Sequence, residues 1–277
     1  MVTLSAFSDE VSHNLKTQIK FLQKQGVSAM EIRFVDGINI VNHALSTVNE
    51  FKKVLDDADI EISALGSPVG KIRLDESFED HLELFKRTME IANVLGATNI
   101  RIFSYYPGDD QNIDDCMDEV LERMHKKIAL MPGSNLKLVH ENEAGIFGHS
   151  ADNCAKLASQ LDSAYFGLVY DPANFVWGEE IKNNMSVCWP QMKSYVSHIH
   201  IKDWTVGHSI GDIPGKGHGQ IPELIQKLVE MEYTGFLTME PHLDKGGQFG
   251  GETTPEQFES AIDAIRILAD EAKLELT

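Results

Sequence analysis

Three carboxylates and one imidazole in the second half of the chain have the residue types and the spacing of a metal site. They are Glu141, Asp171, His200 and Glu240. Each ends or closely follows a short apolar run typical of a β-strand, and the gaps between them are 30, 29 and 40 residues. Because one strand-plus-helix unit needs ~30 residues, successive parallel strands would bring all four to the same place. Such a set suits one divalent cation.

Eight apolar runs with strand character alternate with stretches of helical periodicity. The runs fall at about 2–8, 29–35, 60–67, 98–106, 136–143, 165–175, 196–204 and 235–242. Eight strand–helix units form a (β/α)8 barrel, so we expect residues 1–277 to form a single TIM-barrel domain of the α/β class. The alternative is a doubly wound open sheet, but there a glycine-rich turn usually follows the first strand, where this chain has FSDEVS.

Alternation along the strands predicts that the candidate ligands face the barrel axis. Beside His200, Ile199 and Ile201 are expected to pack on the helices, while His198 and Lys202 share the inward face. Burying several unpaired charges around one axis is very unfavourable. We therefore expect these groups to be paired, bound to a metal ion or placed at the solvated mouth, with His198 as a hydrogen-bonded core histidine.

The second apolar run carries two charged residues, Glu31 and Arg33, which alternate with Ile32 and Phe34. The same alternation would turn both charges toward the barrel axis. A charge at a strand end that reaches water is an equally good explanation for either residue taken alone. The pattern therefore leaves open whether this strand contributes to a site.

The chain is strongly acidic, with 24 basic and 43 acidic residues and a formal net charge of −19. Such a surface repels phosphate backbones and anionic membranes, so we expect no nucleic-acid or membrane partner. No apolar stretch approaches the ~18 residues of a membrane span, and the first residues show no secretory signal. Three scattered cysteines without CxxC spacing fit a reduced protein, and we expect a cytoplasmic location. Basic groups in a pocket would still be compatible with an anionic substrate.

Five motifs resemble those of the xylose isomerase-like TIM barrels, the family of sugar phosphate isomerases and epimerases that includes tagatose 3-epimerase and hydroxypyruvate isomerase. They are HENEAGIFG at 140–148, YDPANF at 170–175, HIKDW at 200–204, PGKGHGQIPELI at 214–225 and YTGFLTMEPHL at 233–243. SALGSPVGKI at 63–72 and RIFSYY at 101–106 extend the resemblance over nearly the whole chain.

The resemblance implies an enzyme that isomerises or epimerises a small sugar, keto sugar or sugar phosphate. It implies one divalent metal ion held by Glu141, Asp171, His200 and Glu240. It also implies that Glu141 and Glu240 act as acid and base on opposite faces of the substrate. In such reactions a proton beside a carbonyl is removed, and the metal stabilises the resulting enediolate. Oxygen ligands with one imidazole favour Mn²⁺ or Mg²⁺, with Co²⁺ or Zn²⁺ as alternatives.

Five further residues are candidates for substrate contact. They are Asn174, Lys202, Glu143, Lys71 and Lys216. Asn174 stands where the tagatose-epimerase type has a substrate-contacting histidine, and KDWTVGH lacks the arginine that this type carries after the metal histidine, so ketohexose specificity does not follow. For Lys202 a salt bridge to a neighbouring acid is an alternative. Lys216 lies in a glycine-rich loop of the kind that holds phosphate in many barrels, or that forms a flexible lid.

Other functions fit the same scaffold. A dehydratase of keto-inositol compounds would use the same fold and metal. A three-zinc apurinic endonuclease, a DNA repair enzyme, would need a histidine where Asn174 stands and an Asp-x-His pair where Asp212-Ile-Pro214 stands. A non-catalytic sugar-binding barrel would have no need of opposed glutamates. The expected partner is a small carbohydrate, and the resemblance also allows for a homo-oligomer, since relatives often form dimers or tetramers.

Overall fold

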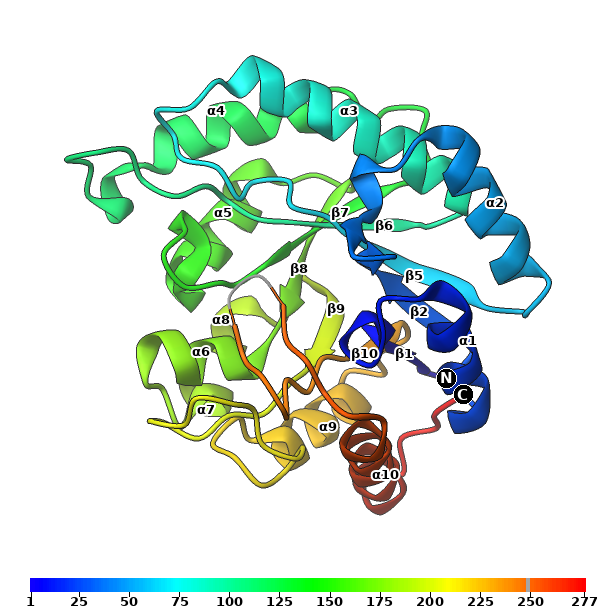
Figure 1. Cartoon of the computed structure of the whole chain (residues 1–277). Coiled ribbons are helices and arrows are strands. Elements are labelled where there is room, and N and C mark those ends of the chain that lie inside the picture. Colours follow the sequence, from blue (N-terminus) through cyan, green and yellow to red (C-terminus); the bar gives the residue numbers. More distant parts are fainter. Residues whose placement is uncertain (248–249) are drawn as a thin grey trace.

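Eight parallel strands close into a barrel in the order β1-β10-β9-β8-β7-β6-β5-β2 (Figure 1). The structure is a computed structural model that describes residues 1–247 and 250–277. The barrel strands are β1 (Thr3–Ala6), β2 (Ala29–Ile32), β5 (Glu61–Gly66), β6 (Asn99–Ile102), β7 (Lys137–Glu141), β8 (Phe166–Tyr170), β9 (Val196–Ile201) and β10 (Phe236–Met239). The predicted (β/α)8 barrel is confirmed.

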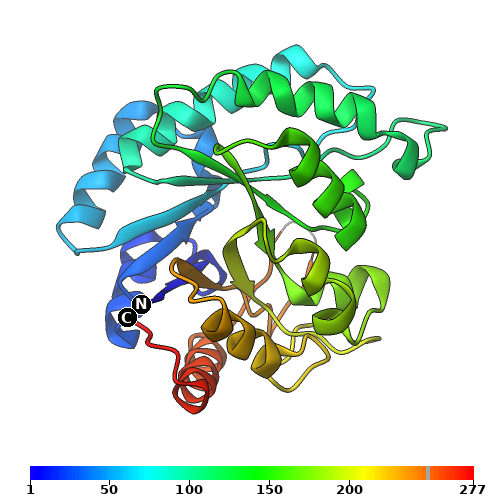
Figure 2. The ribbon, with the colours of Figure 1, turned by 180° about the vertical axis from the view of Figure 1, so that it is seen from behind.

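Helices surround the barrel on the outside, as the two opposite views show (Figures 1 and 2). They are α1 (Leu15–Gln25), α2 (Leu45–Asp56), α3 (Phe78–Leu95), α4 (Met117–Ile128), α5 (Ala151–Leu161), α6 (Pro172–Glu179), α7 (Asn184–Val187), α8 (Trp189–Met192), α9 (Ile221–Glu230) and α10 (Pro255–Ala272). A small hairpin, β3 (Phe34–Val35) with β4 (Ile38–Asn39), lies between β2 and α2. Short 3₁₀ turns are η1 (Ser8–Glu10), η2 (Ile40–Asn42), η3 (Ile113–Asp115) and η4 (Phe147–His149).

The inward and outward faces of β9 and β10 follow the predicted alternation. Ile199, Ile201, Leu237 and Met239 belong to the hydrophobic core. Lys202, from the alternate set, lines the cavity described below. The amino acid pattern of period two therefore separates a packing face from a polar face on these strands.

Two strands are shorter than the apolar runs at 98–106 and 165–175 indicate. β8 stops at Tyr170 because Asp171 caps α6 and Pro172 takes the first helical position. β6 stops at Ile102, and Tyr105 has a φ of 70°, which no β-strand allows. In both cases, residues that are apolar or β-prone serve a turn or a helix start instead of a strand.

Gly70 allows the loop after β5 to lie against the segment after β6. Its φ is +93°, and a Cβ atom at this position would lie 2.0 Å from the carbonyl oxygen of Phe103. The backbone N–H of Phe103 donates to the carbonyl of Val69 (2.8 Å), and that of Tyr105 donates to the carbonyl of Gly70 (2.9 Å). Lys71, the next residue of the loop, is thereby held beside the cavity.

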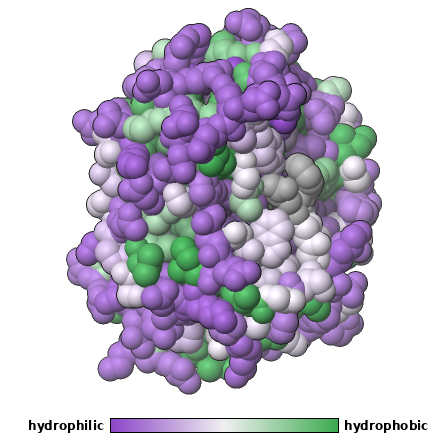
Figure 3. Space-filling model, turned by 90° about the vertical axis from the view of Figure 1, so that its left-hand side faces the viewer, coloured by the Kyte–Doolittle hydropathy of each residue, from purple (hydrophilic) through white to green (hydrophobic). Residues whose placement is uncertain are grey.

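The surface agrees with the acidic, polar composition. Hydrophilic residues cover most of the face shown in Figure 3, and the hydrophobic residues there form small separate groups. Scattered apolar residues of this kind are normal on a folded protein. Among the helices of the described residues, none is both long and apolar enough to cross a membrane.

The close approach at Gly70 predicts a specific loss of stability. We expect Gly70→Ala to lower the free energy of unfolding by at least ~3 kcal/mol, because the new methyl group must displace rigid backbone as well as tolerate a positive φ. Gly133→Ala is the matched control, since Gly133 has a φ of +88° but nothing within 4 Å of its Cβ position. Its expected cost is ~1 kcal/mol. Urea unfolding followed by circular dichroism measures both, and equal losses would contradict the prediction.

Candidate metal centre and substrate cavity

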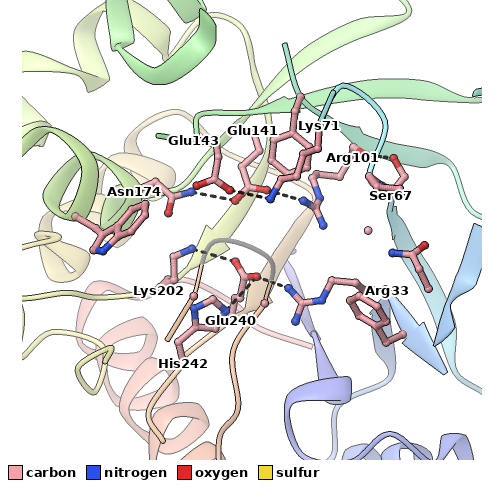
Figure 4. Close-up of a pocket in the computed structure, with 18 of the residues that line it drawn as sticks. Arg33, Ser67, Lys71, Arg101, Glu141, Glu143, Asn174, Lys202, Glu240 and His242 are labelled. Atoms are coloured by element: carbon pink, nitrogen blue, oxygen red, sulfur yellow. Dashed lines mark hydrogen bonds and ion pairs between the residues drawn. The ribbon is translucent and has the colours of Figure 1, made fainter. Parts of the chain in front are cut away.

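A cavity opens at the carboxyl ends of the barrel strands. It encloses about 730 Å³ together with its mouth, and residues in or just after β2, β5, β6, β7, β8, β9 and β10 line it. TIM-barrel active sites lie at this end of the barrel. In Figure 4, Glu141 and Glu240 face one another across the cavity, with basic side chains around them.

The four predicted metal ligands come together in the structure. One ligand atom of each residue lies within 4.8 Å of the others, and all four residues are buried. Two atoms of this set meet only other charged groups of the site. Oδ2 of Asp171 lies 2.7 Å from Nζ of Lys202, and Nδ1 of His200 lies 3.3 Å from Oε1 of Glu141. Three carboxylates and one imidazole are a suitable donor set, so these residues fit one divalent cation.

Asp171 is oriented by the helix that it starts. Its Oδ1 accepts the backbone N–H groups of Ala173 (2.9 Å) and Asn174 (3.1 Å), which is an N-cap of α6. Its other oxygen, Oδ2, lies 2.7 Å from Nζ of Lys202. Because the cap occupies one oxygen, the second is turned toward the other ligands.

His200 is held by a carboxylate on the side away from the other ligands. Its Nε2 lies 3.2 Å from Oε2 of Glu31, and its Nδ1 lies 3.3 Å from Oε1 of Glu141. Glu31 also hydrogen-bonds Nε2 of His198 at 2.8 Å, which in turn contacts Oγ1 of Thr238 at 3.0 Å. Metal-binding histidines usually give their second N–H to such a carboxylate. Glu31 is thus placed to fix the ring of His200, while His198 is a hydrogen-bonded core histidine as expected.

Each of the two candidate catalytic glutamates is held by an arginine. Oε2 of Glu141 lies 3.2 Å from Nη1 of Arg101, and its Oε1 accepts a hydrogen bond from the amide of Asn174 at 3.1 Å. Oε1 of Glu240 accepts a hydrogen bond from Nη1 of Arg33 at 2.7 Å. These charged partners fix the orientation of both carboxylates inside the cavity.

Burial and neighbouring charges set the protonation states. Burial raises the pKa of Glu141, but the positive charges of His200 and Arg101 outweigh it and bring that pKa to about 2. Burial lowers the pKa of His200, but Glu31 and Glu141 outweigh it and raise that pKa to about 10. For Asp171 burial dominates and raises the pKa to about 6. At neutral pH His200 therefore carries a proton that a metal ion must displace.

Four of the five predicted substrate-contact residues line the cavity: Asn174, Lys202, Glu143 and Lys71. Nζ of Lys202 lies 2.7 Å from Asp171 and 3.3 Å from Oε2 of Glu240, so its ion pairs are with these two acids. Nζ of Lys71 pairs with Oε2 of Glu143 at 3.1 Å.

Lys216 is the exception among the predicted substrate-contact residues. It is exposed and does not line the cavity in the described part of the chain. The glycines around it serve Asp203 instead, whose carboxylate accepts the backbone N–H groups of Gly215, Gly217 and Gly219 at 2.8 to 2.9 Å. A Cβ atom at Gly217 would lie 2.4 Å from Oδ1 of Asp203. The loop is glycine-rich because it wraps a carboxylate of the same chain.

Sequence reasoning did not assign Glu31, Arg33 or Arg101 to the site. The alternation in β2 pointed to Glu31 and Arg33 but allowed an equally good alternative. Arg101 gave one weak signal, a charge between two isoleucines in an apolar strand. The structure shows all three buried, each in an ion pair with a neighbour of the site.

The contact between Glu31 and His200 predicts an effect on metal affinity. We expect Glu31→Gln to weaken Mn²⁺ binding ~10–100-fold, because the ring of His200 loses the negatively charged partner that orients it and raises its basicity. Glu61→Gln is the control, since Glu61 is exposed at the start of β5. Calorimetric titration measures both variants. Unchanged affinity in Glu31→Gln, with the fold intact by circular dichroism, would contradict the assignment.

The raised pKa of His200 predicts that metal binding releases a proton. Below a pKa of about 10 the protonated ring competes with the ion, so affinity should rise with pH between 7 and 9. About one proton should leave per ion bound at pH 7.5. Titrations in buffers of different ionisation enthalpy count the protons. A count of zero would show that His200 does not exchange its proton for the ion.

Comparison with known proteins agrees with this geometry. The family model described as "Xylose isomerase-like TIM barrel" matches residues 19–268. A xylose isomerase domain protein from Planctomyces limnophilus has 16% identity and a TM-score of 0.75, covering 98% of this chain and 97% of that one. A D-psicose 3-epimerase, determined in the presence of D-fructose, has 16% identity and a TM-score of 0.75, covering 99% and 100%.

An IOLI protein with a bound zinc atom has 16% identity and a TM-score of 0.72, with 98% of both chains covered. At such identities the likeness to solved structures shows a shared fold. None of the curated proteins is similar enough in sequence to match. The family model spans most of the described residues, from α1 to α10. The chain belongs to the xylose isomerase-like TIM-barrel family.

Proposed function

We propose that the protein is a divalent-metal-dependent enzyme that isomerises or epimerises a small sugar, keto sugar or sugar phosphate. One observation carries the proposal: two buried glutamates, Glu141 and Glu240, belong to one set of metal ligands and face each other across the cavity. Each has its own arginine, Arg101 or Arg33. A sugar-binding protein needs no such pair, whereas an enzyme that moves a proton between two faces of a substrate does.

The proposed ligands of the ion are Glu141, Asp171, His200 and Glu240. Their oxygen-rich donor set favours Mn²⁺ or Mg²⁺, with Co²⁺ and Zn²⁺ as alternatives. When bound, the ion supplies Lewis-acid stabilisation for the negative charge that develops on the substrate oxygen. The structurally similar IOLI protein was determined with a bound zinc atom, which supports the proposal that a protein of this fold holds a metal.

Glu141 and Glu240 are the proposed acid and base. Burial raises the pKa of Glu240, but Lys202 and His242 outweigh it and hold that pKa well below its usual range, and the pKa of Glu141 is about 2. Both carboxylates are thus ionised at neutral pH, and either accepts the proton beside the substrate carbonyl. The glutamate that accepts this proton becomes the acid, and its return to the neighbouring atom gives the isomer. Epimerisation requires that the opposite glutamate has first taken up a proton from water, which it then delivers to the other face of the same carbon.

The remaining side chains bind and shield the substrate. The amide of Asn174 lies 3.1 Å from Glu141, and the ammonium of Lys202 lies 3.3 Å from Glu240. Lys202 pairs with two acids and keeps a third N–H group for a substrate oxygen. Asn174 already donates both amide N–H groups, to Glu141 and to the carbonyl of Asn142, so its side-chain oxygen is the group left to accept a substrate hydroxyl. Trp177 and Trp204 line the same cavity and supply flat apolar walls that sugars can stack on.

We also place the protein in carbohydrate metabolism in the cytoplasm. Three observations support this part of the proposal. Cys116, Cys154 and Cys188 are free and buried, as in reduced proteins. The net charge of −19 disfavours nucleic acid as a partner. The cavity has the size for a small molecule.

Loss of either glutamate should remove turnover but spare part of the proton exchange. We expect Glu141→Gln and Glu240→Gln each to lower the rate of epimerisation ~10²–10⁴-fold. Each variant should still exchange deuterium into the one epimer whose proton faces the remaining glutamate. Proton NMR in D₂O with a panel of ketoses and keto-inositols follows both processes.

Glu223→Gln, at an exposed position of α9, serves as the control and should keep full activity. Circular dichroism verifies that all variants are folded. Full activity in both cavity variants would refute the acid and base assignment. Loss of water from a keto-inositol, without inversion of any ketose, would identify a dehydratase instead.

A further inference from the structure

The lining of the cavity does not share the strong acidic excess of the chain as a whole. The sequence has 43 acidic and 24 basic residues. Among the described residues that line the cavity, four are basic and three are acidic: Arg33, Lys71, Arg101 and Lys202 against Glu141, Glu143 and Glu240. A bound divalent cation would add further positive charge. A cavity that binds only neutral hydroxyl groups would not need this many basic residues in its lining.

Two of these basic residues stand on either side of a glycine. Gly66 ends β5, between β2, which leads to Arg33, and β6, which carries Arg101. A Cβ atom on Gly66 would lie 2.8 Å from Cε1 of Phe7, 3.0 Å from Cβ of Arg33 and 3.2 Å from Nη2 of Arg101. The missing side chain thus leaves room for the guanidinium group of Arg101 and for the ring of Phe7, on which Arg33 stacks. Figure 4 shows both arginines on the same side, across from Asn174 and Lys202.

Each arginine uses only part of its guanidinium group for other residues. Arg33 contacts Asp9 through Nε and Glu240 through Nη1. Arg101 contacts Glu141 through Nη1, and its Nε is 3.9 Å from Glu31. No hydrogen bond or ion pair among the described residues uses Nη2 of either arginine. Four N–H donors are therefore left over at this wall.

Aromatic rings hold the planes of both guanidinium groups. Cζ of Arg33 lies 4.3 Å from the ring centre of Phe7, and Cζ of Arg101 lies 4.5 Å from that of Phe103. Such stacking fixes the direction of the remaining donors before a ligand arrives. A pair of preorganised guanidinium groups with free N–H donors is the usual protein site for a carboxylate or a phosphoryl group.

We infer that Arg33 and Arg101 bind an anionic group of the substrate, so that the enzyme acts on an acidic hydroxy-carbonyl compound, a sugar acid or a sugar phosphate. This inference rests on the proposed function for the identity of the substrate as a hydroxy-carbonyl compound. The glutamates occupy Nη1 of each arginine, and the anionic group takes Nη2. The two arginines thereby set the distance between the anionic group and the carbon that loses its proton.

The alternative is that the arginines only orient Glu141 and Glu240. The two explanations differ in the affinity for matched ligands. D-Fructose, D-fructuronate and D-fructose 6-phosphate share a ketose and differ at one end, which is neutral, carboxylate or phosphoryl. Calorimetric titration of the Mn²⁺-loaded protein with each compound compares them without turnover. We expect at least one acidic ketose to bind about tenfold or more tightly than D-fructose. Whichever acid binds more tightly identifies the anionic group.

Two kinds of variant test the arginines themselves. Arg101→Gln and Arg33→Gln should reduce the preference for the acidic ketose to about threefold or less. Gly66→Ala keeps every charge but places a methyl group 2.8 Å from the ring of Phe7 and 3.2 Å from Nη2 of Arg101. It therefore displaces both guanidinium groups, one through Phe7, and should have the same effect. It serves in place of the arginine variants should these fail to fold. Equal binding of all three ketoses by the unmodified protein, or an unchanged preference in the folded variants, would overturn the inference.

Deuterium exchange separates this inference from the proposed function. An acidic ketose that binds with the expected preference in an arginine-dependent manner establishes the anion subsite, whatever chemistry follows. Exchange of a ketose proton in D₂O without any preference for acidic ketoses supports the isomerase or epimerase and refutes the subsite. The two proposals therefore fail on different measurements.

Discussion

Compensation of buried charge around the barrel axis is the constraint on which the site depends. Glu31, Glu141 and Glu240 are at most 5% exposed, and a buried carboxylate without partners costs several kcal/mol. Arg33 just after β2 and Arg101 in β6, on either side of β5, supply the opposite charges together with His200. Removing one member of a buried pair costs ~3–5 kcal/mol, whereas an exposed pair is worth ~1 kcal/mol or less. The network therefore fixes side-chain positions that the many surface ion pairs cannot fix.

At the strand ends, the surrounding backbone N–H groups determine which carboxylate oxygens remain available to the site. Asp171 uses Oδ1 to cap α6 and leaves Oδ2 for a cation. Asp203, one strand later, uses both oxygens for the backbone of the glycine-rich loop. A short acidic side chain at a strand end thus serves either the backbone or the site, according to how many N–H groups surround it. The local backbone decides which carboxylates remain available for chemistry.

The distinction between local patterns and contacts far apart in the chain explains which features the sequence predicts. The barrel and the convergence of the four ligands follow from strand spacing and from period-two alternation, which are local properties of the chain. The inward position of Lys202 follows in the same way. Lys216 does not line the cavity among the described residues. A glycine-rich loop has the same sequence pattern whether it surrounds a ligand or a carboxylate of its own chain. The partners of Glu31 and Glu240 lie 167 and 207 residues away, and only closure of the barrel brings such residues together.

The surface is strongly acidic whereas the lining of the cavity is not. Charge therefore acts differently on an approaching ligand at long range and at hydrogen-bond distance. At physiological ionic strength, fields are screened beyond ~8 Å, yet a net charge of −19 still attracts divalent cations and repels free anions near the surface. An anionic substrate therefore gains nothing from long-range steering. Its recognition depends on N–H donors within hydrogen-bond distance, in a place where Arg33 and Arg101 are already paired and held by aromatic rings. The net charge of the chain thus favours the approach of a metal cation, whereas the N–H donors of the two arginines would select an anionic substrate.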